Sequence, residues 1–131
     1  AEKLTADYFA NSILINDGKG NFTLHALPWQ AQLTPYRDAL IVDANNDDLP
    51  DIMLAGNFYS NHIEMGRNDQ EYGSILINKD NGNFEVSPFN GLQVKGQVRH
   101  IREITIGKTK ACILARNNDS TIVMRFNHAK P

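Results

Sequence analysis

A twelve-residue phrase occurs twice in this 131-residue chain. Residues 11–22 read NSILINDGKGNF and residues 73–84 read GSILINKDNGNF, so eight of the twelve positions are identical and each matched pair is 62 residues apart. Each copy consists of a short apolar run, a turn rich in Asn, Asp and Gly, and an aromatic residue that opens the next run, which is the pattern of a β-hairpin. The chain is therefore expected to contain repeated hairpins.

Further apolar runs alternate with polar turns along the rest of the chain. No segment keeps an amphipathic helical period over three turns. We therefore predict an all-β fold of antiparallel, blade-type β-repeats, either a β-propeller or a fragment of one. Besides the two hairpins of the phrase, strands are expected at 37–43, 51–56, 98–106, 110–115 and 121–126.

The expected strands group into units of unequal size. A lead-in at 1–11 precedes one repeat domain at 12–131, which divides into a partial blade (12–35), a full blade (36–97, with a polar insertion at 58–72) and a degenerate partial blade (98–131). Without the fifteen-residue insertion, the 62-residue spacing leaves 47 residues, a length typical of one blade. Both end units carry unpaired strand edges, so closure within the chain, a homo-oligomer and additional blades all remain open.

Leu14 and Leu76 occupy the same position in the two copies of the phrase, each between two isoleucines. Short apolar runs of this kind are typical of strands that are buried on both faces. Both leucines are therefore predicted to be buried, and truncating either one should destabilise the fold.

The composition argues against several classes of partner. The formal net charge is -2, and Lys and Arg are scattered, so no nucleic-acid or anionic-membrane surface is expected. Apolar runs do not exceed about five residues, which is too short for a membrane span. Cys112 is the one cysteine and lies in an apolar run, so a buried thiol is expected. The chain starts at Ala1 and shows no leader, although one could have been removed.

Residues 43–51, DANNDDLPD, carry the most specific chemistry in the chain. Side-chain oxygens at positions 1, 3, 5 and 9 and the main-chain carbonyl at position 7 can converge on one point when the loop curls. Hard oxygens that include three carboxylates suit Ca²⁺ better than Mg²⁺. The alternative is a metal-free turn in which Asn and Asp bond their own backbone. The predicted metal ligands are Asp43, Asn45, Asp47, the carbonyl of Leu49, and Asp51.

This loop, the Gly56-Asn57 pair and the repeated phrase together resemble the FG-GAP/VCBS repeats of integrin α-subunit-like β-propellers. The pattern of that family is roughly D-x-N-x-D-G-x-x-D, an apolar strand, Gly-Asn, and later a strand that ends in N-x-G-x-G-x-F. The resemblance covers residues 12–57 and 72–84, and it implies that Ca²⁺ bound by the loop side chains braces a blade. Asp48 replaces the usual Gly, and the corresponding loop at 105–110 is shorter and lacks carboxylates, so no metal is expected there.

The insertion at 58–72 carries further candidate residues for ligand binding, because loops on a rigid scaffold often carry function. The alternative is a solvated connection without a function of its own. No nucleophilic or zinc motif such as G-x-S-x-G or H-E-x-x-H is present in the sequence. The candidates for ligand binding are His62, Glu64, Arg67, Asp69 and Tyr72, and the aromatics that could stack on a sugar or lie in the core are Trp29, Tyr36, Phe58, Tyr59 and Tyr72.

These features favour a binding module over an enzyme. The resemblance implies a calcium-braced, non-enzymatic module for carbohydrate or protein ligands, located extracellularly, in a periplasm or at a cell surface. One alternative is a domain of a secreted carbohydrate-active enzyme whose acid and base come from Glu64, Asp69 and Glu71. Another is a purely structural fragment of a larger propeller protein.

Overall fold

The computed structural model describes residues 3–57, 59, 72–80, 82–88 and 93–125. These residues form nine β-strands and one short 3₁₀ helix, which confirms the all-β prediction. The elements are β1 (Ser12–Asn16), β2 (Phe22–Ala26), η1 (Trp29–Gln32), β3 (Tyr36–Val42), β4 (Asp51–Gly56), β5 (Ser74–Asn78), β6 (Phe84–Pro88), β7 (Val98–Ile106), β8 (Thr109–Arg116) and β9 (Ile122–Met124).

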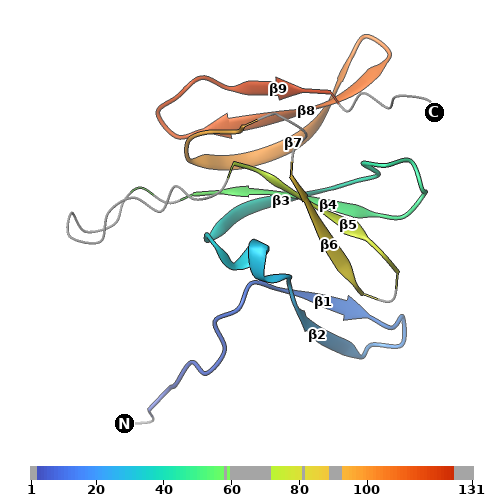
Figure 1. The fold of residues 1–131 in the computed structure, drawn as a ribbon, viewed down its shortest axis with the longest axis vertical. Coiled ribbons are helices and arrows are strands. Elements are labelled where there is room, and N and C mark those ends of the chain that lie inside the picture. Colours follow the sequence, from blue (N-terminus) through green and yellow to red (C-terminus); the bar gives the residue numbers. More distant parts are fainter. Residues whose placement is uncertain (1–2, 58, 60–71, 81, 89–92, 126–131) are drawn as a thin grey trace.

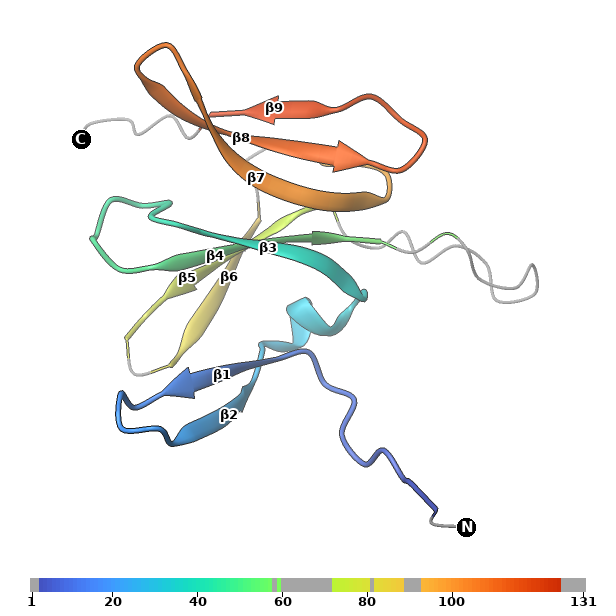
Figure 2. The same cartoon turned by 180° about the vertical axis from the view of Figure 1, so that it is seen from behind.

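The strands form three antiparallel sheets, β1-β2, β3-β4-β5-β6 and β7-β8-β9. The sheets contain two, four and three strands. The strands predicted within 12–35, 36–97 and 98–131 have the same grouping. Figures 1 and 2 show the sheets stacked as layers, with the four-stranded sheet in the middle. Within the described residues, no strand of the first sheet pairs with a strand of the third. The described part of the chain therefore does not close on itself through strand pairing between these two sheets.

The two copies of the repeated phrase have the same hairpin register. Asn16 pairs with Phe22 in β1-β2, and Asn78 pairs with Phe84 in β5-β6. In each copy the Asn side chain accepts a hydrogen bond from the backbone N–H two residues later, at 2.9 Å. An Asn at this position satisfies a turn amide with its own side chain, so the local sequence sets the turn and the turn sets the register.

The β3-β4 and β7-β8 hairpins also share a register. Each has an irregularity near the start of its first strand, between Tyr36 and Asp38 in β3 and between Val98 and His100 in β7. Beyond it, the paired positions are offset by 62 residues in the first strand and by 60 in the second. The difference arises because the connection to β8 is two residues shorter than the acidic loop between β3 and β4.

Strand β4 is buried on both faces and separates two apolar cores. Every residue of β4 is buried. Met53 and Ala55 lie in the core between the second and third sheets, whereas Ile52 and Leu54 lie in the core between the first and second. Successive side chains of a strand point to opposite faces, so one short strand contributes to both cores.

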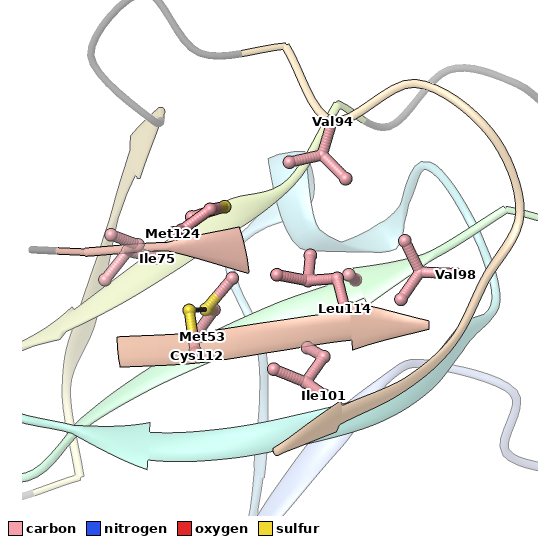
Figure 3. Close-up of a cluster of buried hydrophobic side chains, with 9 residues drawn as sticks. Met53, Ile75, Val94, Val98, Ile101, Cys112, Leu114 and Met124 are labelled. Carbon is pink, nitrogen blue, oxygen red and sulfur yellow. Dashed lines mark hydrogen bonds between the residues drawn. The ribbon is translucent and has the colours of Figure 1, made fainter. Parts of the chain in front are cut away.

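The core between the second and third sheets contains the single cysteine (Figure 3). Cys112 is free and buried, as predicted, and burial raises the pKa of its thiol. A thiol held in its protonated form in an apolar core is a poor nucleophile, so a packing role fits this residue. Around Met53, the other buried members of this core are Ala55, Ile75, Val94, Val98, Ile101, Leu114 and Met124.

The Asp38 carboxylate joins the second sheet to the third. It accepts hydrogen bonds from the Ile101 backbone N–H at 2.9 Å and from Arg102 Nη1 at 2.6 Å. Burial pushes the pKa of Asp38 upward, but the hydrogen bonds from Ile101 and Arg102 outweigh burial and hold the pKa below its usual range. Asp38 is therefore ionised at neutral pH and links β3 to β7 as a charged acceptor.

The prediction that both leucines of the phrase are buried is wrong for one of them. Leu76 is 0% exposed, whereas Leu14 is 61% exposed. The first sheet covers Leu76, but none of the described residues covers the equivalent face of β1. The phrase sets the strand and its register, whereas burial depends on whether another sheet lies on that face.

Replacing Leu76 with Ala is expected to lower the free energy of unfolding by about 2–5 kcal/mol, because the substitution leaves a cavity in a packed core. Leu14→Ala is the matched control and should change it by about 0.5 kcal/mol or less, because the side chain is exposed. Denaturant unfolding at low chain concentration measures both values. Equal losses for the two variants would contradict the difference in burial.

Candidate functional site

The acidic loop at 43–50 connects β3 to β4 and is folded by its own side chains. The Asp47 backbone N–H donates to Asp43 Oδ1 and to Asn45 Oδ1, both at 3.2 Å. The Asp48 backbone N–H donates to the second carboxylate oxygen of Asp43 at 3.3 Å. The side-chain oxygens of Asp43 and Asn45 therefore meet at the backbone N–H of Asp47.

Asp47 is the most exposed of the predicted carboxylate ligands and is held in its charged form. It accepts hydrogen bonds from Asn45 Nδ2 at 2.7 Å and from the Leu49 backbone N–H at 2.9 Å. These two bonds lower the pKa of Asp47 against the opposing effect of burial, and the charge of Lys79 adds to the lowering. An ionised, accessible carboxylate is the kind of oxygen that Ca²⁺ prefers.

Two residues of the loop adopt left-handed backbone conformations. The φ angles are 60° at Asn46 and 64° at Asp48. Asn and Asp tolerate this region better than other residues that carry a Cβ, because their short polar side chains bond locally. Asp48 therefore fills the position that the FG-GAP/VCBS pattern gives to Gly.

Asp51 is fully buried at the start of β4 and has a structural role. One carboxylate oxygen accepts the Ala44 backbone N–H at 2.9 Å, and the other accepts the Asn78 backbone N–H at 2.8 Å. The Asn78 side chain returns a hydrogen bond to the Pro50 carbonyl at 3.2 Å. Asp51 thus fastens both the acidic loop and the β5-β6 hairpin to β4.

The donor set of the loop fits a hard divalent cation, but its oxygens are already engaged with the loop itself. Among the described residues, no group of three or more His, Cys, Asp and Glu side chains forms a preassembled metal site. Coordination would draw on the free lone pairs of Asp43, Asn45 and Asp47, since a carboxylate or amide oxygen can accept more than one partner. Leu49 is half-buried beside them.

A cavity of about 260 Å³ adjoins the loop between the second and third sheets. Asp43 belongs to both the loop and the cavity wall. Across the cavity, Lys110 pairs with Glu103 at 3.1 Å. Sequence analysis missed this cavity because its walls come from strands of different sheets. The remaining lining residues are Leu40, Val42, Thr109, Ala111 and Cys112.

Of the residues predicted to bind a ligand from the insertion, the structure places only Tyr72. Its side chain is 42% exposed, and its carbonyl accepts the Val94 backbone N–H at 2.8 Å. Tyr72 precedes β5, at the end of the sheets where β4 finishes, opposite the acidic loop (Figure 1). The other candidates, His62, Glu64, Arg67 and Asp69, lie outside the described residues, as do Phe58 and the proposed catalytic Glu71.

Trp29 is exposed on η1, which leads into the start of β3 (Figure 1). Its side chain is 71% exposed. The helix that carries it is fixed by Asn11, whose Nδ2 donates to the carbonyls of Ala31 at 2.9 Å and Thr34 at 3.0 Å. Trp29 is therefore a large aromatic surface on a restrained support, whereas Tyr36 is half-buried against the core.

Comparisons with protein-family models, with curated proteins and with solved structures gave no match to this chain. The resemblance to FG-GAP/VCBS repeats therefore stays a prediction from the sequence. Within the described part of the chain, no helix is long and apolar enough to cross a membrane.

Proposed function

We propose that this chain is a non-enzymatic binding module of the propeller-blade type, in which Ca²⁺ at residues 43–51 braces the hairpin of the central sheet. Its ligand is a carbohydrate or a protein, bound at the opposite end of the sheets, outside the cytoplasm. The observation that carries the calcium role is the meeting of the Asp43 and Asn45 side-chain oxygens at the Asp47 backbone N–H.

Electrostatics and connectivity support the calcium role. Asp43, Asp47 and Asp48 place three carboxylates within six residues, and a divalent cation relieves the repulsion between them. Asp51 links the same loop to the neighbouring β5-β6 hairpin through backbone hydrogen bonds. Ordering the loop would therefore stabilise the whole central sheet and not the turn alone.

The exposed aromatics support the ligand role. Trp29 and Tyr72 flank strands at the end of the sheets away from the acidic loop, and Trp29 is positioned by hydrogen bonds to η1. Trp and Tyr offer a large apolar face with a polar edge and few rotatable bonds, so they dominate many binding surfaces. A sugar ring or an apolar protein side chain could stack there.

Adding Ca²⁺ should raise the melting temperature, because a ligand bound only by the folded loop contributes about 2.7 kcal/mol at one hundred times its Kd. Mg²⁺ should stabilise the fold much less, because it demands a tighter octahedral site. Asp43→Ala and Asp47→Ala should each abolish the response to Ca²⁺. Differential scanning calorimetry in Ca²⁺, in Mg²⁺ and in chelator measures these effects.

Asp17→Ala is the matched control for the calcium experiment. Asp17 lies in a turn outside the acidic loop and accepts the Lys19 backbone N–H at 2.7 Å and Asn21 Nδ2 at 2.7 Å. Asp47 likewise accepts one backbone N–H and one Asn side-chain amide. This variant should keep the full response to Ca²⁺. A parent protein that melts at the same temperature in Ca²⁺ and in chelator would refute the calcium role.

A glycan array, followed by calorimetry on any hit, tests the ligand surface. Trp29→Ala should weaken binding about tenfold or more, as removal of a central aromatic contact does. Ile41→Ala is the control, because Ile41 is exposed but lies on β3 near the acidic loop. Binding that survives the loss of Trp29 unchanged would place the ligand elsewhere, and a chain that binds neither glycans nor protein would refute the binding role.

A further inference from the structure

The first sheet exposes one apolar face. Leu14 pairs with Leu24, and Asn16 pairs with Phe22, so the three apolar side chains share a face. Leu14 and Phe22 are each 61% exposed, and Leu24 is 49% exposed. The other face of the same sheet packs on the central sheet through Ile13. We call the surface formed by Leu14, Phe22 and Leu24 the leading face.

The equivalent of the leading face in the central sheet is covered. Leu76, Phe84 and Val86 occupy the same register positions in β5-β6. Leu76 is fully buried in the core between the first and second sheets, and Phe84 and Val86 are partly buried and pack against that core. The chain itself therefore shows what covers such a face, namely the apolar side of a neighbouring β-sheet.

The third sheet has a face of the opposite kind, which is exposed in part. Ile113 pairs with Val123, and strand alternation turns both away from Cys112 and Leu114, which pack on the central sheet. Ile104 lies on the same face as Ile113, because it pairs with the residue two positions before Ile113. Val123 is 51% exposed, whereas Ile104 and Ile113 are half-buried. We call the surface formed by Ile104, Ile113 and Val123 the trailing face.

The equivalent of the trailing face in the central sheet is also covered. Met53 and Ile75 form the corresponding pair of β4-β5 and lie in the core beneath the third sheet. The second sheet therefore packs on the first through the side that corresponds to the leading face. The third sheet packs on the second in the same way, against the side that corresponds to the trailing face. The two exposed faces are the two halves of one more such contact.

From this repetition we infer that the chain self-associates head to tail, with the leading face of one copy packed on the trailing face of another. The two faces lie at opposite ends of the stack, so one chain cannot satisfy its own contact without unstacking its sheets (Figures 1 and 2). The contact uses different surfaces on the two partners, and its repetition produces a ring or a filament. This inference does not depend on the proposed calcium or ligand sites.

The association should be weak. The first sheet has only two strands of five residues each, which is small beside the roughly 800 Å² per partner that a standard interface buries. Micromolar or weaker dissociation constants are therefore expected, and the measurement must extend from about 10 µM to about 1 mM. Over this range, sedimentation equilibrium should give an average mass that rises with the concentration of the parent chain.

Two variants test the geometry of the contact. L14D/L24D places charge on the leading face, and V123D places it on the trailing face. Each variant alone should lose self-association by about tenfold or more, whereas an equimolar mixture should form dimers, because each partner supplies one intact face. Ile41→Asp is the control. Ile41 is exposed on β3 and belongs to neither the leading face nor the trailing face, so this variant should associate like the parent.

Several results would overturn the inference. A parent chain that stays monomeric up to the highest concentration refutes self-association. Self-association that is lost in L14D/L24D but kept in V123D means that two leading faces pair with each other, and association kept in L14D/L24D excludes the leading face. Circular dichroism confirms that each variant folds, and L14N/L24N replaces L14D/L24D if the charged pair does not.

Discussion

The packing of β4 side chains into two cores at once holds the three sheets together. Ile52 and Leu54 contact the core beside the first sheet, while Met53 and Ala55 contact the core beside the third. Burying each large aliphatic side chain contributes about 1.5–3 kcal/mol, so this short strand contributes to both sheet-to-sheet contacts. The acidic loop at one end of β4 and the aromatic residues near the other end take their positions from this strand.

Two carboxylates add directional contacts to this apolar packing. Asp51 bonds the backbone of the acidic loop and of β5 within the central sheet. Asp38 bonds the backbone of Ile101 and so connects the central sheet to the third. Both accept backbone N–H groups of other segments, which supply partners that those donors would otherwise lack. The sheets are therefore held in register by side-chain hydrogen-bond acceptors as well as by apolar contact.

Much of the strand order was predictable from the sequence, because it depends on local chemistry. The Asn16 and Asn78 turns fix the two hairpins, and the apolar run of β4 has the length of a buried strand. The exposure of Leu14 was not predictable from its own phrase, because burial depends on a neighbouring sheet. The role of Asp51 was missed in part: its spacing indicates a metal ligand, but only the fold brings Asn78 to it. The cavity beside Asp43 was missed because its lining residues come from different sheets.

Native-state hydrogen exchange tests the central claim, that β4 is the strand on which both cores depend. At low chain concentration, the β4 amides should be among the slowest to exchange and should open only by global unfolding, whereas the amides of β1 and β2 should exchange faster through local opening. The reason is that β4 is covered on both faces and the first sheet on only one. Exchange from β4 that is as fast as exchange from β1 would contradict the account.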